Sequence, residues 1–390
     1  MEVASMKGSN NDSLVLAVNS GSSSLKFGLY AEGERDEALL YRGEASGVGR
    51  RDGKLKIVDA EGEIVYSDGY ASSSQADAFE SVLSHLNGRG IGTIAAVGHR
   101  VVHGGPHLRQ HQRITDDVLK TLKAAVHFAP LHIPASIHLI EKSRDLLPDA
   151  GQFACFDTAF HATMPETSSR FALPEELYQK GVQRYGFHGL SYESILHRMQ
   201  GRLPARVVCA HLGSGASLVA LCEGRSVDTS MGLTPAGGIP MSSRVGDIDP
   251  GVLIFLMRNE GMDANALETT VNQRGGLAAL SGGESDMRQL QVRMEQGDKR
   301  AALAVNAFAV AVRKFIGAYA AELGGLDLLI FSGGIGEHSE FVRNLICEGL
   351  GFLGIDPRRT GTESKVLVMA SEEELQIARH ARRLMAVATV

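Results

Sequence analysis

Three glycine- and serine-rich turns, each directly after an apolar run, are the first feature of this sequence that could do chemistry. They span residues 19–24, 213–217 and 332–336. Such turns present successive backbone N–H groups with little side-chain obstruction, which suits phosphate oxygens. None of them has the Gly-Lys-Ser/Thr ending of a P-loop or opens a GxGxxG helix. One such turn is more often a plain hairpin, but three together favour phosphate binding.

Two arginines lie in settings where a fixed positive charge could serve phosphoryl transfer. Arg100 lies in Gly98-His99-Arg100-Val101-Val102-His103-Gly104-Gly105, at the end of an apolar run, and Arg244 follows Met241-Ser242-Ser243. A lone arginine of this kind is more often a structural ion-pair partner. Phosphoryl transfer needs positive charge around the equatorial oxygens, and the planar guanidinium supplies it in a rigid fork. The pair therefore fits a phosphotransferase.

The acids and histidines have both a catalytic and a structural interpretation. Asp157 follows an apolar strand, His188 stands between aromatics and glycines, and Glu373 lies at the start of the last predicted helix. A carboxylate near transferring phosphates is the usual magnesium partner. Asp157 and Glu373 could equally cap helices, and a histidine such as His188 is more often a hydrogen-bonded core residue.

The elements that must position these residues repeat along the chain. A strand, a Gly/Ser turn and a strand open each half, at 14–18 and 25–30 and again at 206–211 and 218–222. This repeat predicts a duplicated α/β fold. Other predicted strands are 39–42, 55–58 and 63–66, which continue a β-meander, and 94–102 and 326–331; predicted helices are 75–86, 116–126, 134–147 and 300–323. Ser371 with Glu374 predicts a capping box for a last helix.

Composition narrows the function classes. A chain of 390 residues predicts two domains. The net charge of −6 and the absence of a basic run argue against a nucleic-acid or anionic-membrane surface. The four cysteines lie in apolar stretches without metal-ligand spacing, which indicates reduced thiols in the cytoplasm. Residues 1–13 predict a disordered leader without a signal peptide, and no segment is expected to be long enough to span a bilayer.

Several of these motifs, in the same order, resemble the acetate kinase signatures. They are Val18-Asn19-Ser20-Gly21-Ser22-Ser23-Ser24-Leu25-Lys26, the Gly98–Gly105 segment given above, Phe156-Asp157-Thr158-Ala159-Phe160-His161 and Arg184-Tyr185-Gly186-Phe187-His188-Gly189. The resemblance runs from about Leu14 to the C-terminus. It implies the acetate and sugar kinase/Hsp70/actin superfamily, an α/β class with duplicated actin-like, ribonuclease H-like βββαβαβα domains and an interdomain active-site cleft. The expected N-terminal domain is 14–158 with the helix 376–390, and the expected nucleotide-binding, dimerising domain is 159–375.

The resemblance also implies roles for individual residues. Arg100 and Arg244 would hold the acetate carboxylate and the transferring phosphoryl group, and His188 would stabilise that group. Asp157 would be catalytic, and Glu373 with Asn19 would belong to the metal site, taking Mg²⁺ with Mn²⁺ as a substitute. No general base is needed because a carboxylate is already ionised at neutral pH, so positioning and charge neutralisation are the whole task.

The substrate pockets follow from the same resemblance. The acyl group of acetate would meet Val102, Leu131, Phe187 and Pro235, a set that suits a very short chain. The residues expected to bind ATP or ADP are Ser24, Lys26, His211, Gly213, Ser214, Gly215, Asp286, Met287, Arg288, Gly334, Ile335 and His338. A cytoplasmic homodimer is the expected assembly.

Three residues depart from the family pattern, which has Asn in place of Ser214, Ile133 and His338. Ser214 can still donate one hydrogen bond, and His338 leaves nucleotide preference open. The rival interpretations are a propionate or other short-chain acyl kinase, a non-catalytic actin-like nucleotide-binding regulator, and a sugar kinase with Asp157 as general base. Retention of the charged residues argues against the regulator, and the two arginines favour an anionic acceptor over a sugar hydroxyl.

Overall fold

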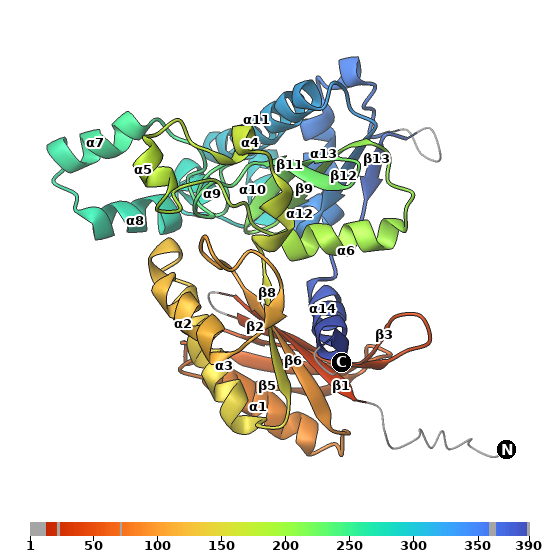
Figure 1. Cartoon of the computed structure of the whole chain (residues 1–390). Helices are drawn as coiled ribbons and strands as arrows, with labels where there is room; N and C mark the ends of the chain where they lie inside the picture. Colours follow the sequence, from red (N-terminus) through yellow and green to blue (C-terminus); the bar gives the residue numbers. More distant parts are fainter. Residues whose placement is uncertain (1–12, 22–23, 71, 359–363, 388–390) are drawn as a thin grey trace. The chain divides into compact units, whose positions relative to one another are not determined.

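The computed structural model describes residues 13–21, 24–70, 72–358 and 364–387 (Figure 1). It is a mixed α/β structure with two separate sheets. Contacts divide the chain into unit 1, which runs to Ala159 and resumes at Glu372, and unit 2, Phe160–Ser371. The predicted disordered leader lies outside the described residues, apart from Ser13.

Unit 1 is built on an eight-stranded sheet in the order β5-β4-β3-β2-β1-β6-β8-β7. Its strands are β1 (Leu14–Ser20), β2 (Ser24–Glu32), β3 (Glu37–Ser46), β4 (Lys54–Asp59), β5 (Ile64–Gly69), β6 (Ile94–Val101), β7 (Gln112–Arg113) and β8 (Gly151–Phe156). Its helices are α1 (Gln75–Asn87), α2 (Asp116–Ala124), the 3₁₀ turn η1 (Val126–Phe128), α3 (Ile133–Leu146) and α14 (Glu373–Val387). Strands β1 to β5 form the predicted antiparallel meander, whereas β1, β6 and β8 are parallel.

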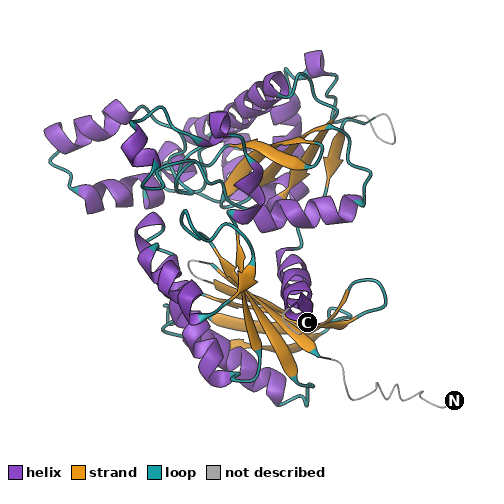
Figure 2. Ribbon diagram, in the orientation of Figure 1, coloured by secondary structure: helices purple, strands orange, loops and turns teal. Residues whose placement is uncertain are grey.

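Helices cover both faces of this sheet (Figure 2). Alternate residues of β1, among them Leu16 and Val18, share an apolar core with Phe79 of α1. The opposite face packs against α14. A side-chain carbon on Gly98 of β6 would lie 2.6 Å from Cγ2 of Ile377, closer than packed atoms can approach. Glycine at this position therefore lets α14 lie against the sheet and fixes where its first turn stands.

Unit 2 is built on a five-stranded sheet in the order β11-β10-β9-β12-β13. Its strands are β9 (Arg206–Leu212), β10 (Ala216–Cys222), β11 (Arg225–Thr229), β12 (Leu328–Ser332) and β13 (Val366–Val368). Its helical elements are α4 (Glu166–Ser169), α5 (Glu175–Tyr178), α6 (Gly189–Met199), α7 (Pro250–Asn259), α8 (Ala264–Gln273), α9 (Gly276–Ser281), α10 (Met287–Glu295), α11 (Lys299–Glu322), α12 (Gly333–His338), α13 (Glu340–Cys347) and the 3₁₀ turn η3 (Gly351–Leu353). A further 3₁₀ turn, η2 (Ala159–Thr163), spans the junction in sequence between the two units.

The two sheets have the same topology, which confirms the predicted duplication. The order β11-β10-β9-β12-β13 repeats the order β3-β2-β1-β6-β8 of unit 1. The directions match as well: the first two pairings along each order are antiparallel and the last two parallel. In both units the first strand is therefore central, and its carboxyl end lies beside that of a parallel neighbour.

Helix α11 corrects one expectation. Its 24 residues are long and apolar enough to cross a membrane by length and composition, although no such segment was expected. One face of the helix, with Val305, Phe308 and Val312, is fully buried. That face packs against β9 and β10, while α6 contributes to an apolar cluster with residues of β9 and β10. The helix thus serves as a core helix of unit 2.

Two further local predictions are wrong. Residues 332–336 do not form a simple turn, because Gly333 takes a positive φ of 74° and begins helix α12. The capping box of Ser371 and Glu374 does not form either, since α14 begins at Glu373. The carboxylate of Glu374 instead accepts a hydrogen bond from the Asn19 side chain.

Candidate active site

Three side chains of unit 1 meet where parallel strands end. Asn19 is near the end of β1, Arg100 near the end of β6, and Asp157 directly follows β8. Nε of Arg100 lies 3.0 Å from both carboxylate oxygens of Asp157, and one Nη atom lies 2.6 Å from Oδ2. The other Nη atom donates to Oδ1 of Asn19 at 3.1 Å. Two neighbouring strands thus hold the guanidinium in one orientation.

The first turn of α14 brings two more carboxylates to this point. Nδ2 of Asn19 donates to Oε2 of Glu373 at 2.9 Å and to Oε1 of Glu374 at 2.8 Å. The cluster therefore combines one guanidinium with three carboxylates, one amide linking Arg100 to both glutamates. Sequence reasoning assigned Glu374 only to a helix cap, because charge at a helix start is normally explained that way.

Burial sets the electrostatics of this cluster. Burial raises the pKa of Asp157, and the charge and hydrogen bonds of Arg100 oppose that rise. Burial alone would lower the pKa of Arg100, but the charges of Asp157 and Glu373 outweigh it and raise this pKa. The pKa of Glu374 is raised by burial and by the neighbouring charge of Glu373. The guanidinium thus stays charged among carboxylates that repel one another, an arrangement that attracts a further cation.

A cavity of about 340 Å³ lies in the same unit, and Val102 and Leu131 are among its lining residues. Val102 is buried, and Leu131 is 52% exposed. Val102 is only two residues beyond Arg100 along the chain. Two of the four predicted acyl-pocket residues therefore share one cavity in unit 1, while Phe187 and Pro235 belong to unit 2.

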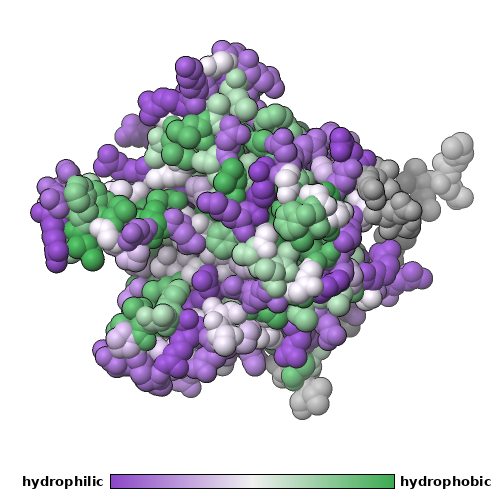
Figure 3. Space-filling view, turned by 90° about the horizontal axis from the view of Figure 1, so that it is seen from above, coloured by the Kyte–Doolittle hydropathy of each residue, from purple (hydrophilic) through white to green (hydrophobic). Residues whose placement is uncertain are grey.

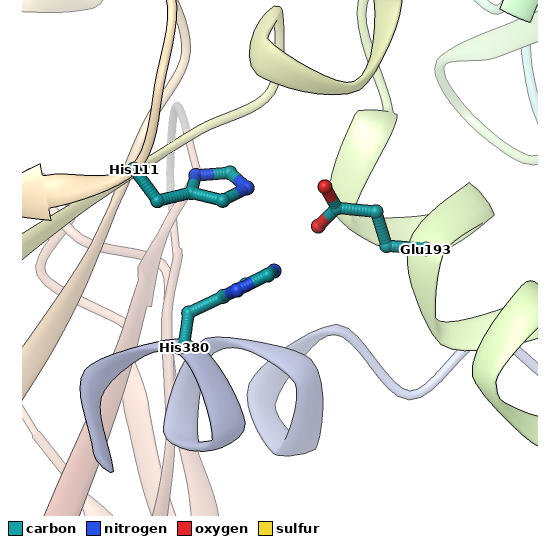
Figure 4. Close-up of side chains that lie close together, drawn as sticks. All are labelled: His111, Glu193 and His380. Atoms are coloured by element: carbon teal, nitrogen blue, oxygen red, sulfur yellow. The ribbon is translucent and has the colours of Figure 1, made fainter. Parts of the chain in front are cut away.

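His111 is a neighbour of Asp157 that sequence reasoning missed. Its Nδ1 accepts a hydrogen bond from the backbone N–H of Phe156 at 3.0 Å. Its ring contacts that of His380 on α14, with centroids 4.0 Å apart (Figure 4). Glu193, also drawn in Figure 4, belongs to α6 of unit 2.

The predicted residues His188 and Arg244 come together in unit 2 beside the second glycine turn. A side-chain carbon on Gly215 would lie 3.4 Å from Nε2 of His188 and 3.5 Å from an Nη atom of Arg244. His188 has a left-handed backbone, with φ 59°, immediately before α6, and its Nδ1 is 2.9 Å from the Ser217 hydroxyl. Left-handed backbone in a residue other than glycine is uncommon and typical of functional sites.

The glycine turns of unit 2 also lie next to each other. A side-chain carbon on Gly213 would be 3.9 Å from the backbone nitrogen of Gly334. The turns are adjacent because β9 and β12 are parallel neighbours, with His211 opposite Ser332 in the register. Nδ1 of His211 lies 3.2 Å from the Ser332 hydroxyl. The backbones of two glycine-rich segments therefore lie side by side, an arrangement that suits a phosphate chain.

The remaining predicted residues of unit 2 have varied surroundings. Arg244 donates to the carbonyl of Pro235 at 3.4 Å, and Ser214 is exposed with its carbonyl bonded to the N–H of Ser242. Phe187 is buried, and its carbonyl is 3.0 Å from Nε2 of His161. Burial lowers the pKa of His161 to about 4, so this imidazole is neutral and supports the His188 loop.

The predicted adenosine segment begins a helix. Asp286 is the N-cap of α10, and its carboxylate also pairs with Arg288, which lowers its pKa to about 2. Met287 is buried, whereas Arg288 and His338 are exposed; Ile335 lies on α12 with His338. Ser24 and Lys26 belong instead to β2 of unit 1, where Lys26 lies opposite Asn19 in the register.

Comparison with known proteins decides the family. The model of the acetokinase family matches residues 14–380 of this chain. The chain belongs to the acetokinase family. It is 40% identical to the acetate kinase of Alkaliphilus metalliredigens, over 95% of this chain and 100% of that protein. As a member of this kinase family it uses ATP as phosphoryl donor.

Solved structures agree with this assignment. The chain superposes on the acetate kinase of Porphyromonas gingivalis with a TM-score of 0.84 and 36% identity, covering 96% of this chain and 100% of that one. It superposes on a propionate kinase of Francisella tularensis with a TM-score of 0.88 and 34% identity, covering 95% and 100%. The predicted kinase identity and the duplicated actin-like fold are thereby confirmed.

Proposed function

We propose that this chain is an acetate kinase that transfers the γ-phosphoryl group of ATP reversibly to acetate, giving ADP and acetyl phosphate. The observation that carries the proposal is the guanidinium of Arg100, held by Asp157 and Asn19, two residues from an apolar wall formed by Val102. A fixed cation beside a small apolar surface is what a short carboxylate needs. The guanidinium orients the carboxylate, and the apolar wall receives the methyl group.

The transfer is direct and in line. A carboxylate oxygen attacks the γ-phosphorus and ADP leaves, and no general base takes part because the nucleophile is already an anion. Arg244 and His188, beside Gly215, stabilise charge on the transferring group. The glycine turns of unit 2, with Gly213 and Gly334, bind the phosphates, and the N-terminal ends of α10 and α12 bind the nucleoside.

Magnesium fits the carboxylates of unit 1. The charges of Arg100, Asp157, Glu373 and Glu374 sum to −2, and oxygen donors are the ligands that Mg²⁺ prefers. Glu373 and Glu374 would hold the ion, with Mn²⁺ as a substitute. Asn19 orients the two glutamates, because its own oxygen already accepts from Arg100. When bound, the ion neutralises charge on the phosphates.

The test is an acyl-hydroxamate assay with ATP, magnesium and acetate, propionate or butyrate. Magnesium-dependent product is expected with all three acids and strongest with acetate. The matched variants are Arg100→Lys, which keeps the charge but loses the fork, and Lys123→Arg, at an exposed ion pair in the same unit. Arg100→Lys should lower kcat/KM by at least about a hundredfold, and Lys123→Arg should not change it. Absence of product with every acid would refute the proposal.

Propionate is the second candidate substrate. A high structural similarity to a propionate kinase and a cavity of about 340 Å³ both favour some room beyond a methyl group. One methylene changes discrimination by only about 1–3 kcal/mol, so activity with propionate is expected in either case. A kcat/KM for propionate above that for acetate would reverse the assignment.

We propose further that the protein is a homodimer formed through α7 of unit 2. This helix has no buried residue, and Val252, Ile254, Phe255 and Met257 are each 44–54% exposed. Apolar surface gathers where α7 and α8 lie, at the left of Figure 3. A second copy would cover this exposed apolar face. Phe255→Glu should yield monomers in sedimentation experiments, whereas Glu260→Gln, at the end of the same helix, should leave the dimer intact.

A cytoplasmic location completes the proposal. All four cysteines are described and none forms a disulfide; three are buried and Cys222 is exposed. Free thiols are typical of a reducing compartment. Localisation of a fluorescent fusion outside the cytoplasm would contradict this part of the proposal.

A further inference from the structure

The cavity lined in part by Val102 and Leu131 has more room than acetate needs. Its volume, about 340 Å³, lies in the range of small-molecule sites. A single water molecule occupies about 30 Å³ of liquid, so a methyl group fills only a small part of this space. The excess volume lies within unit 1 and is lined by β1, α1 and α3 together with the loop around Gly49.

Apart from Val48, Val102, Leu131 and Ala135, the cavity wall is polar and uncharged. It is formed by serines, glycines, two histidines and Gln75; among the described residues that line the cavity none is Asp, Glu, Lys or Arg. A carboxylate or ammonium group placed here would find no counter-ion. The wall therefore suits a neutral group that forms hydrogen bonds.

Gln75 supplies the clearest sign of such a ligand. The residue is 8% exposed, and its Nε2 donates to the carbonyl of Gly21 at 2.7 Å. Within the described part of the chain its Oε1 is buried and has no hydrogen-bond partner. A buried acceptor without a hydrogen-bond partner lowers the stability of the fold. A ligand in the cavity that donates a hydrogen bond to Oε1 of Gln75 would remove this cost.

The first turn of α1 adds donors beside this acceptor. Gln75 is the first residue of this 13-residue helix, and the Ser74 side chain caps it by accepting from the N–H of Asp77. The first N–H groups of a helix have no helical partner and carry partial positive charge. A hydroxyl group matches the combination, because it donates one hydrogen bond and accepts others.

We infer that this cavity admits short ω-hydroxycarboxylic acids as phosphoryl acceptors, with the distal hydroxyl donating to Oε1 of Gln75. The inference rests on the proposed function, because the carboxylate is still held by Arg100. The reaction is the same: a carboxylate oxygen bonds to the γ-phosphorus, the bond to ADP breaks, and the hydroxyl takes no part. The product is an ω-hydroxyacyl phosphate.

The experiment compares each hydroxy acid with the alkyl acid that has the same number of heavy atoms. The pairs are glycolate with propionate, 3-hydroxypropionate with butyrate and 4-hydroxybutyrate with valerate, and ADP formation is measured in the full-length protein with magnesium and ATP. For at least one pair, kcat/KM should favour the hydroxy acid by about tenfold, the effect of one net hydrogen bond. Acetate is the reference substrate in every assay.

Two variants separate the hydroxyl contact from general packing. Gln75→Leu removes the acceptor and should abolish the hydroxyl preference while acetate kinetics change less than about twofold. Ala135→Leu, at an exposed position of α3 on the cavity wall, should lower kcat/KM for the longer acids and spare acetate. Ala321→Leu, at an exposed position of α11 in unit 2, is the matched control.

The outcomes are distinct. Turnover of acetate with an equal or greater preference for the alkyl acid in all three pairs overturns the inference and leaves the proposed function intact. A hydroxyl preference that survives both Gln75→Leu and Ala135→Leu shows that the hydroxyl binds elsewhere, and it overturns the assignment of this cavity. If even acetate gives no ADP, the proposed function and the inference fail together. If Gln75→Leu loses acetate turnover by disturbing the turn at Gly21, Ala135→Leu decides.

Discussion

Replacing Asp157 by Asn should destabilise unit 1 strongly while hardly changing its shape. The variant keeps the size of the side chain but removes the negative charge that faces Arg100. The side chains of Arg100 and Asp157 are only 17% and 2% exposed, so little water can compensate for the loss. Three hydrogen bonds to the carboxylate are weakened in the same step.

The expected magnitude follows from burial. Removing one partner of a buried ion pair typically costs about 3–5 kcal/mol. The nearby charge of Glu373 still partly balances the guanidinium, so the lower end, about 3 kcal/mol, is the better expectation. In a domain of this size each kcal/mol lowers Tm by roughly 2–4 °C, which gives a decrease of roughly 6–12 °C.

Differential scanning calorimetry is the assay, because it can resolve separate transitions in a protein with two units. The control is Glu141→Gln, which breaks the Lys123–Glu141 pair; its side chains are 56% and 45% exposed. That change should cost less than about 1 kcal/mol. The double variant Arg100→Met/Asp157→Leu should recover most of the stability but no activity, since apolar pairs often replace buried ion pairs without loss. Equal Tm values for Asp157→Asn and Glu141→Gln would refute the reasoning.

Three other changes test the structure. Burial lowers the pKa of His99 to about 4, so only the unfolded chain gains a proton at this residue as the pH falls below about 6.5. The His99→Leu variant should therefore recover roughly 2 kcal/mol of the free energy of unfolding that the protein loses at pH 5. The measurement is the urea midpoint at about pH 7.5 and at about pH 5, which should differ less in the variant. The Gly186→Ala variant should unfold at a much lower temperature, because Gly186 has φ 72° and a side-chain carbon would lie 2.6 Å from the ring of His161. The control is Gly62→Ala, where φ is 89° but the added carbon meets open space. This control should lower the free energy of unfolding by only about 1 kcal/mol. The Ser214→Asn variant should preserve or raise kinase activity, because an amide adds a hydrogen-bond donor at the exposed tip of the second glycine turn. A large loss of kcat would contradict the proposal that this turn binds phosphate.

The sequence was most informative where chemistry and topology coincide. The repeated strand–turn–strand pattern predicted the duplicated fold, because apolar runs of that length have few alternatives to a buried strand. Asn19, Arg100 and Asp157 could be expected near one another because each lies at the end of one such run. The structure adds that β1, β6 and β8 are adjacent and parallel, and long-range pairing of this kind leaves no local signal in a sequence.

Other parts of the candidate site could not be predicted from sequence. Glu374 belongs to a run of three glutamates, and nothing in the sequence shows which of them contact Asn19. His111 lies in a polar segment without periodicity, and its contact with His380 joins residues far apart in the chain. The helix at 333–338 was mistaken for a turn because glycine, which begins α12 with a positive φ, usually marks the end of an element.

The position of α14 in unit 1 has a consequence for synthesis on the ribosome. Asn19 and Glu373, which share a hydrogen bond, are 354 residues apart, and all of unit 2 is translated between them. At about 5–20 residues per second, the first strand of unit 1 waits roughly 20–70 s for the last helix of that unit. During that time the sheet face at Gly98 lacks its cover, and the carboxylates of Glu373 and Glu374 are missing beside Asn19. The nascent chain therefore completes unit 2 before unit 1, and the kinase cannot become active until translation of its final helix is finished.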